Sequence, residues 1–176
     1  MRRPVKYLLI LLAALLLNPV RAFHARAQDD VDYKAYSLFV YNFIKYIEWP
    51  NLDAEFRIGV MGDSPVLKEL QNLAKAKKAK GKPIVIKVIS SPEEALGCHL
   101  VYISSSKSST LKALLEKTKG KPVLLVGERE GLAKKGAGLS FITMDDDVLK
   151  FEFNKTAIES NQLKIPSALT NLGLPI

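Results

Sequence analysis

Cysteine and histidine are nearly absent from this chain of 176 residues. It contains one cysteine, Cys98, and two histidines, His24 and His99. A single cysteine cannot form an internal disulfide, so the packing of a hydrophobic core must stabilise the fold. So few thiolate and imidazole ligands also cannot complete a four-ligand structural zinc site without several carboxylates. We therefore expect neither a disulfide scaffold nor a bound metal, and we expect no cofactor.

The chain also lacks the motifs that usually carry catalysis. His99 begins a predicted strand and Cys98 directly precedes it, so their side chains should point to opposite faces, which is poor geometry for proton transfer. The acidic run 145–147 lacks the alternating carboxylates of a calcium loop, and no Gly-x-Gly-x-x-Gly fingerprint links a strand to a helix. We therefore predict that the protein is not an enzyme and has no catalytic residues. A hydrolase using Cys98 or the serines at 104–106 is an alternative.

The N-terminal apolar run is too short to span a membrane. It covers residues 7–17, whereas a spanning helix needs about 20 apolar residues. Basic residues precede the run, and Ala25-Arg26-Ala27 follows it, which is the pattern of a secretory signal peptide cleaved before Gln28. We predict that residues 1–27 are a signal peptide removed on export to the periplasm, and that residues 28–176 form one domain. The alternative is an N-terminal anchor that stays attached.

Most of the excess positive charge belongs to this leader. Cleavage would remove five of the 26 basic residues and none of the 18 acidic ones, so the formal net charge falls from +8 to about +3. A nearly balanced charge is not the signature of a nucleic-acid-binding protein. We therefore expect no nucleic acid partner and at most peripheral contact with a membrane surface.

Strand patterns alternate with helical patterns along the rest of the chain. We predict strands at 56–61, 84–89, 99–104, 122–126, 139–144 and 148–153. We predict helices at 31–47, 65–79, 92–96, 108–117, 128–134, after Asn154 and at 163–172. This alternation predicts an α/β fold: a three-layer sandwich whose mainly parallel sheet of about six strands has helices on both faces. The turn at 145–147 makes the C-terminal strand antiparallel.

Charge is expected to differ between the two edges of that sheet. Lysines and a glycine end three predicted helices, at 78–81, 117–120 and 134–136, where they offset the helix dipole and cap the helix. Acidic and hydroxyl side chains gather at the other edge. Helix capping is the simplest explanation, and a basic edge that faces an anionic membrane or an acidic partner is the alternative.

Two groups of residues are candidates for binding. The first helix is rich in aromatic residues that cannot all face one core stripe, so we predict that Tyr41, Phe43, Tyr46 and Trp49 contact a partner or a second copy of the chain. In open parallel sheets, ligands bind outside the carboxyl ends of the strands. A small-ligand receptor would therefore use Asp63, Ser64, Ser104 and Ser105.

Six segments resemble the YfiR family, in the order in which the family has them. They are 39–50 (FVYNFIKYIEWP), 56–64 (FRIGVMGDS), 98–104 (CHLVYIS), 123–128 (VLLVGE), 151–154 (FEFN) and 163–169 (LKIPSAL). No single segment is diagnostic, but the ordered set is fairly specific and extends over the whole region after the leader.

The resemblance implies a periplasmic α/β domain, often a dimer, that acts without catalysis. Members of the family restrain a membrane-bound diguanylate cyclase by binding its periplasmic sensor region, which lowers cyclic-di-GMP signalling. We therefore expect an exported regulatory binding protein whose partner is a diguanylate cyclase or another inner-membrane sensor, such as a sensor kinase. The chain departs from some members in having Cys98 alone where they carry paired cysteines.

Overall fold

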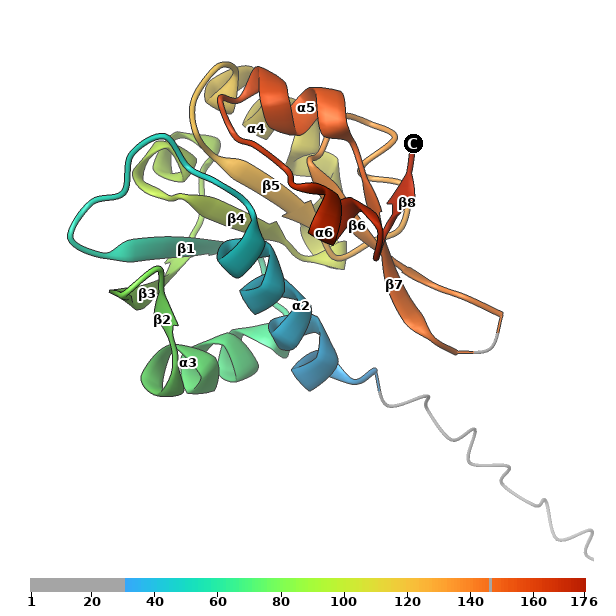
Figure 1. The fold of residues 1–176 in the computed structure, drawn as a ribbon, viewed down its shortest axis with the longest axis horizontal. Coiled ribbons are helices and arrows are strands. Elements are labelled where there is room, and N and C mark those ends of the chain that lie inside the picture. Colours follow the sequence, from blue (N-terminus) through green and yellow to red (C-terminus); the bar gives the residue numbers. More distant parts are fainter. Residues whose placement is uncertain (1–30, 146) are drawn as a thin grey trace, which may run out of the picture. The chain divides into compact units, whose positions relative to one another are not determined.

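The structure of the protein is a computed structural model that describes residues 31–145 and 147–176 (Figure 1). The signal peptide predicted for residues 1–27 lies outside this part of the chain. The strands are β1 (Phe56–Met61), β2 (Lys78–Ala79), β3 (Lys82–Ile89), β4 (Leu100–Ile103), β5 (Leu124–Gly127), β6 (Leu139–Thr143), β7 (Leu149–Phe153) and β8 (Leu174–Pro175). The helices are α2 (Tyr33–Tyr46), α3 (Val66–Ala76), α4 (Leu111–Thr118), α5 (Lys155–Ser160) and α6 (Ser167–Thr170), with 3₁₀ helices η1 (Pro92–Gly97) and η2 (Ser105–Thr110).

One mixed sheet contains all the strands, in the order β2-β3-β1-β4-β5-β6-β7-β8. Strands β3, β1, β4, β5 and β6 are parallel to one another, and β7 is antiparallel to β6, as predicted. The chain runs from β1 outward to β3 and then returns to the other side of β1 at β4. The strand order therefore switches direction between β1 and β4, and their carboxyl ends flank the crevice where such sheets usually bind ligands.

The prediction of about six strands was too low. All six predicted strands are present, and the sheet gains β2 and β8 at its two ends. Each of these strands has only two residues, which is too short to show a period-two hydrophobic pattern. The α/β class and the mostly parallel sheet agree with the prediction.

Helix α2 forms where the sequence predicts it and packs on the C-terminal half of the sheet. Asp32 caps its first turn by accepting a hydrogen bond from the Ala35 N–H at 3.1 Å. The ring of Phe43 lies 5.0 Å from that of Phe151 and 5.9 Å from that of Phe141, centroid to centroid. Ile47, which follows the helix, is already extended.

Buried residues of the sheet contribute alternately to two hydrophobic clusters. In β4, Leu100 and Tyr102 belong to the cluster that includes α2 and α3, whereas Val101 and Ile103 belong to the cluster that includes α4. This alternation is the period of two that a strand imposes on its side chains. Helices therefore cover both faces of the central strands. Within residues 31–145 and 147–176, no helix is both long enough and apolar enough to cross a bilayer.

The predicted helix at 128–134 is wrong, because these residues form consecutive turns instead. Gly131 has a left-handed backbone (φ 77°), and its N–H donates to the buried carboxylate of Glu152 at 3.2 Å. A second carboxylate oxygen of Glu152 pairs with Lys134 Nζ at 2.7 Å. The β7 carboxylate thus organises this loop, and a contact between distant residues outweighs the local helical pattern.

Helix α3 also ends earlier than predicted. It stops at Ala76, and Lys78–Ala79 pairs with the start of β3 as a hairpin. Lys80 and Gly81 form the turn with positive φ values of 50° and 84°. Of the three lysine-rich segments, only 117–120 ends a helix, so helix capping explains one of them. All three precede parallel strands and therefore lie at one edge of the sheet, as predicted.

Candidate functional site

The aromatic residues predicted to bind a partner divide into buried and accessible pairs. Phe43 is fully buried, and Trp49 is 8% exposed and donates from Nε1 to the His99 carbonyl at 3.2 Å. Tyr41 and Tyr46 are half-buried, so each packs against the core with part of its ring and leaves the rest accessible. The structure therefore assigns Phe43 and Trp49 to the core, while a partner-binding role for Tyr41 and Tyr46 stays a prediction.

The residues predicted for a small-ligand crevice come together only in part. Gly62 and Ser104 are in close contact, since a Cβ on Gly62 would lie 2.3 Å from Ser104 Oγ. Ser64 is buried and accepts a hydrogen bond from the Val66 N–H at 3.3 Å, whereas Asp63 is exposed. Ser105 donates to Glu128 at 3.0 Å. Ser64 and Ser104 are thus engaged in packing and local hydrogen bonds, whereas Ser105 is hydrogen-bonded to Glu128.

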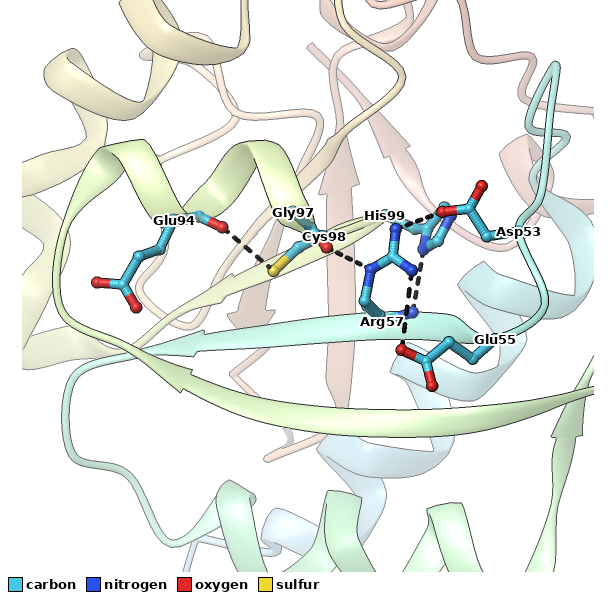
Figure 2. A network of polar contacts seen from close by, with 7 residues as sticks. All are labelled: Asp53, Glu55, Arg57, Glu94, Gly97, Cys98 and His99. Carbon is cyan, nitrogen blue, oxygen red and sulfur yellow. Dashed lines mark hydrogen bonds and ion pairs between the residues drawn. The ribbon is translucent and has the colours of Figure 1, made fainter.

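A cluster of charged residues at the opposite edge of the sheet was missed by the sequence analysis. Figure 2 shows the guanidinium of Arg57, on β1, between the carboxylates of Asp53 and Glu55 and the carbonyl of Gly97. Arg57 pairs with Asp53, its Nε donates to the Gly97 carbonyl at 2.5 Å, and its Nη1 lies 3.8 Å from Glu55. Arg57 is the only charged residue in the six-residue strand FRIGVM, and that isolated charge was the available signal.

The charged cluster borders an open pocket of about 390 Å³. The residues lining it come from the loop before β1, from η1 and from the chain segments that begin β4 and β5: Asn51, Asp53, Arg57, Leu96, Cys98, His99, Lys121, Pro122 and Val123. The hydrogen bond and charge of Arg57 hold the pKa of Asp53 below its ordinary value, and the same pairing raises the pKa of Arg57. The pocket thus combines a paired arginine, a second cation and an imidazole.

His99 lies at the base of this pocket as a neutral acceptor. Its Nδ1 accepts the Arg57 backbone N–H at 3.0 Å, and its ring stacks on Phe56 with the centroids 4.9 Å apart. The neutral imidazole therefore carries its proton on Nε2. Burial, assisted by the positive charge of Arg57, lowers the pKa of His99 below 6.5. This histidine is held in the uncharged form.

Cys98 is a buried thiol with little thiolate character. Its side chain is 5% exposed, and Sγ lies 3.7 Å from the Glu94 carbonyl that accepts from it. Burial raises the pKa of the thiol above its ordinary value, although Lys87 and Arg57 oppose the effect. A thiol protonated at neutral pH is a poor nucleophile.

Replacing His99 with asparagine should flatten the pH dependence of stability. His99 has a lower pKa in the folded protein than in the unfolded chain, so on acidification the unfolded chain binds the proton first. The stability of the wild type therefore falls as the pH drops from about 6.5 through the lowered pKa of the folded state. The asparagine side chain in H99N retains an oxygen that can accept the Arg57 N–H but does not titrate. Thermal melts between pH 8 and 5, values that bracket the ordinary histidine pKa of about 6.5, should show a smaller decline for H99N. Parallel profiles for the two proteins would refute the assignment of a neutral imidazole.

These features define the class of the molecule: a small mixed α/β domain with polar groups gathered at both edges of a mostly parallel sheet. Comparison with known families is consistent with this class and narrows it. The profile of the YfiR/HmsC-like family matches residues 33–173, from the first residue of α2 to the residue before β8. The chain therefore belongs to the YfiR/HmsC-like family. A comparison with curated proteins gave no match.

Proposed function

We propose that the protein is an exported regulatory binding protein that controls a membrane-bound signalling partner from the periplasm. The partner is a diguanylate cyclase, and the contact is made with its periplasmic sensor region. The observation that carries this proposal is the family match, which extends over residues 33–173 and so includes nearly the whole described domain. Regulation by the members of this family acts through binding and requires no turnover.

The chemistry of the two most reactive side chains supports binding rather than catalysis. Burial raises the pKa of Cys98 and lowers that of His99. The thiol therefore stays protonated, and the imidazole Nδ1 is occupied by the Arg57 N–H at 3.0 Å. A cysteine–histidine pair works as nucleophile and base only when the thiol is activated by the imidazole. The protonated thiol and the occupied imidazole nitrogen both count against a hydrolase that uses Cys98 as its nucleophile.

The outer face of α2 is the surface on which the proposal places the contact. Leu38 is 51% exposed, and Tyr41 and Tyr46 are half-buried beside it. The Tyr41 hydroxyl donates to the Lys78 carbonyl at 3.4 Å, and Lys45 Nζ lies 5.0 Å from the centre of the Tyr46 ring. Tyrosine is enriched at protein interfaces, so two partly accessible tyrosines near an exposed leucine support a contact on this face.

Deleting the gene in its host should raise cellular cyclic-di-GMP, and the full chain supplied in trans should restore the original level. A chain that lacks residues 1–27 should not restore it, because the proposal requires export. Mass spectrometry of nucleotide extracts measures the effect. Unchanged cyclic-di-GMP in the deletion strain would count against a cyclase as the partner.

Two matched leucine variants locate the contact surface. Leu38→Ala and Leu172→Ala remove the same side chain at similar exposure, 51% and 61%, from α2 and from the turn after α6. The proposal predicts that L38A complements the deletion poorly and that L172A complements it fully, with both proteins present at wild-type amounts. Equal complementation by the two variants would remove α2 from the contact surface.

A further inference from the structure

The pocket beside Arg57 contains a buried hydrogen-bond donor that the surrounding protein leaves unpaired. His99 lines this pocket and is only 7% exposed. Its Nδ1 accepts the Arg57 N–H from the backbone of β1, so the neutral ring carries its proton on Nε2. Within residues 31–145 and 147–176, the hydrogen bonds of His99 use Nδ1, the backbone N–H and the carbonyl, and none uses Nε2. Because buried polar groups are almost always paired, this N–H indicates that the pocket receives an acceptor.

The unpaired donor is held in a fixed position. The His99 ring stacks on Phe56 with the centroids 4.9 Å apart, and the His99 carbonyl accepts from Trp49 Nε1 at 3.2 Å. The His99 N–H donates to the Arg57 carbonyl, and the His99 carbonyl also accepts the Leu124 N–H, both at 2.9 Å. A donor that is already fixed loses little conformational freedom when a ligand pairs with it.

The charges that line the pocket favour an anion. Two cations line it, Arg57 and Lys121, against one carboxylate, that of Asp53. Asp53 is paired with Arg57 (Figure 2), whereas Lys121 belongs to no ion pair in the part of the chain that the structure describes. The carboxylate of Glu55 stays 3.8 Å from Arg57 Nη1, beyond hydrogen-bonding distance, so Nη1 keeps its N–H groups free. An acceptor that carries negative charge therefore pairs best with these donors.

The rest of the lining favours an organic anion over a bare inorganic ion. Leu96, Pro122 and Val123 form an apolar wall of the pocket. Binding pockets of about 300–1,000 Å³ usually combine apolar walls with a few polar groups, and the volume here, about 390 Å³, lies in that range. A carbon group attached to the anion would cover this wall, which an inorganic ion would leave in contact with water.

We infer that the pocket beside Arg57 and His99 binds a small organic carboxylate. One carboxylate oxygen accepts the His99 Nε2–H, the negative charge faces Lys121 and Arg57, and the carbon part contacts the apolar wall. The pocket lies where β1, β4 and β5 begin. This inference goes beyond the proposed function, since it gives the domain a chemical signal to sense and does not depend on the identity of the protein partner.

Calorimetric titration of the purified exported protein at pH 7 tests the site with benzoate and with benzamide, which has the same shape and no charge. Benzoate should bind about tenfold or more tightly, because only it brings a negative charge to Lys121 and Arg57. Lys121→Gln should weaken benzoate binding about threefold or more and leave benzamide binding unchanged. Lys119→Gln is the matched control: it removes the same charge at an exposed position outside this pocket, and it should bind benzoate as wild type does.

Proton NMR shows whether the anion reaches the imidazole. His99 is the only histidine of residues 28–176, so its ring signals identify themselves. Benzoate should shift these signals saturably, with the dissociation constant found by calorimetry. Four results would overturn the inference: no saturable binding of benzoate at millimolar concentration, equal binding of the two probes, equal benzoate binding by K121Q and K119Q, or His99 signals that stay in place while benzoate binds. All of these readouts use the isolated protein, so they are independent of whether a cyclase is the partner.

Discussion

Replacing Phe43 with alanine should lower the free energy of unfolding by about 3–5 kcal/mol. The side chain is fully buried, and its ring packs edge-on against Phe151 at 5.0 Å and tilted against Phe141 at 5.9 Å. Truncation removes two of the ring contacts that join α2 to β6 and β7 and leaves a cavity that tightly packed neighbours cannot fill. Urea unfolding, with the m-value checked for a constant slope, measures the effect.

Tyr41→Ala is the matched control on the same helix. This ring is half-buried, and its hydroxyl makes one long hydrogen bond at 3.4 Å, so its loss should cost about 1 kcal/mol or less. The two variants separate core from surface among the aromatic residues of α2. If F43A were as mild as Y41A, Phe43 would not anchor the helix, and its assignment to the core would be wrong.

Replacing Glu152 with alanine should lower the free energy of unfolding by about 2–4 kcal/mol, because one buried donor and one partly buried donor lose their acceptor. The Oε2 atom of Glu152 accepts from Ser140 Oγ at 3.0 Å and from the Gly131 N–H at 3.2 Å. The residue is 3% exposed and is the last but one residue of β7. Its removal should also loosen the turns at 128–134, which amide hydrogen exchange at Gly131 and Ala133 would report as lower protection.

Glu152→Gln keeps an acceptor and removes the charge, so it should cost less than E152A. Burial raises the pKa of Glu152, but Lys134 and the donors on Ser140 and Gly131 outweigh it, so the folded pKa lies below 4.5. The contribution of the charge is therefore complete at neutral pH and is lost as the pH falls from about 4.5 through the folded value. The difference between wild type and E152Q should shrink in that acidic range. A difference that stays constant down to the acid transition would show that Lys134 adds no stability.

The sequence allowed the six longer strands to be predicted because each carries a period-two or continuous apolar pattern bounded by turn residues. It could not reveal β2 and β8, whose two residues hold no pattern. The local pattern also predicted a helix at 128–134 that does not form. Glu152, more than fifteen positions away, binds the Gly131 N–H and stabilises turns there instead. Local propensity decides only where no distant contact competes with it.

The candidate sites were less accessible to prediction. Composition identified α2 as unusually aromatic, but only packing against Phe141 and Phe151 shows that Phe43 is buried. The Arg57–His99 contact depends on the register between β1 and the start of β4, which joins residues 42 positions apart. Contacts of this kind follow from strand order, which no local pattern encodes.

A binding assay with the sensor regions of membrane-bound diguanylate cyclases tests most directly whether this domain regulates a partner by binding to it. The periplasmic region of each such cyclase in the host would be immobilised, and the exported protein would be passed over it. We expect saturable binding to at least one of them, with faster dissociation for L38A than for L172A. Saturable binding to none of them, together with substrate turnover by the pure protein, would contradict a regulator that acts by binding.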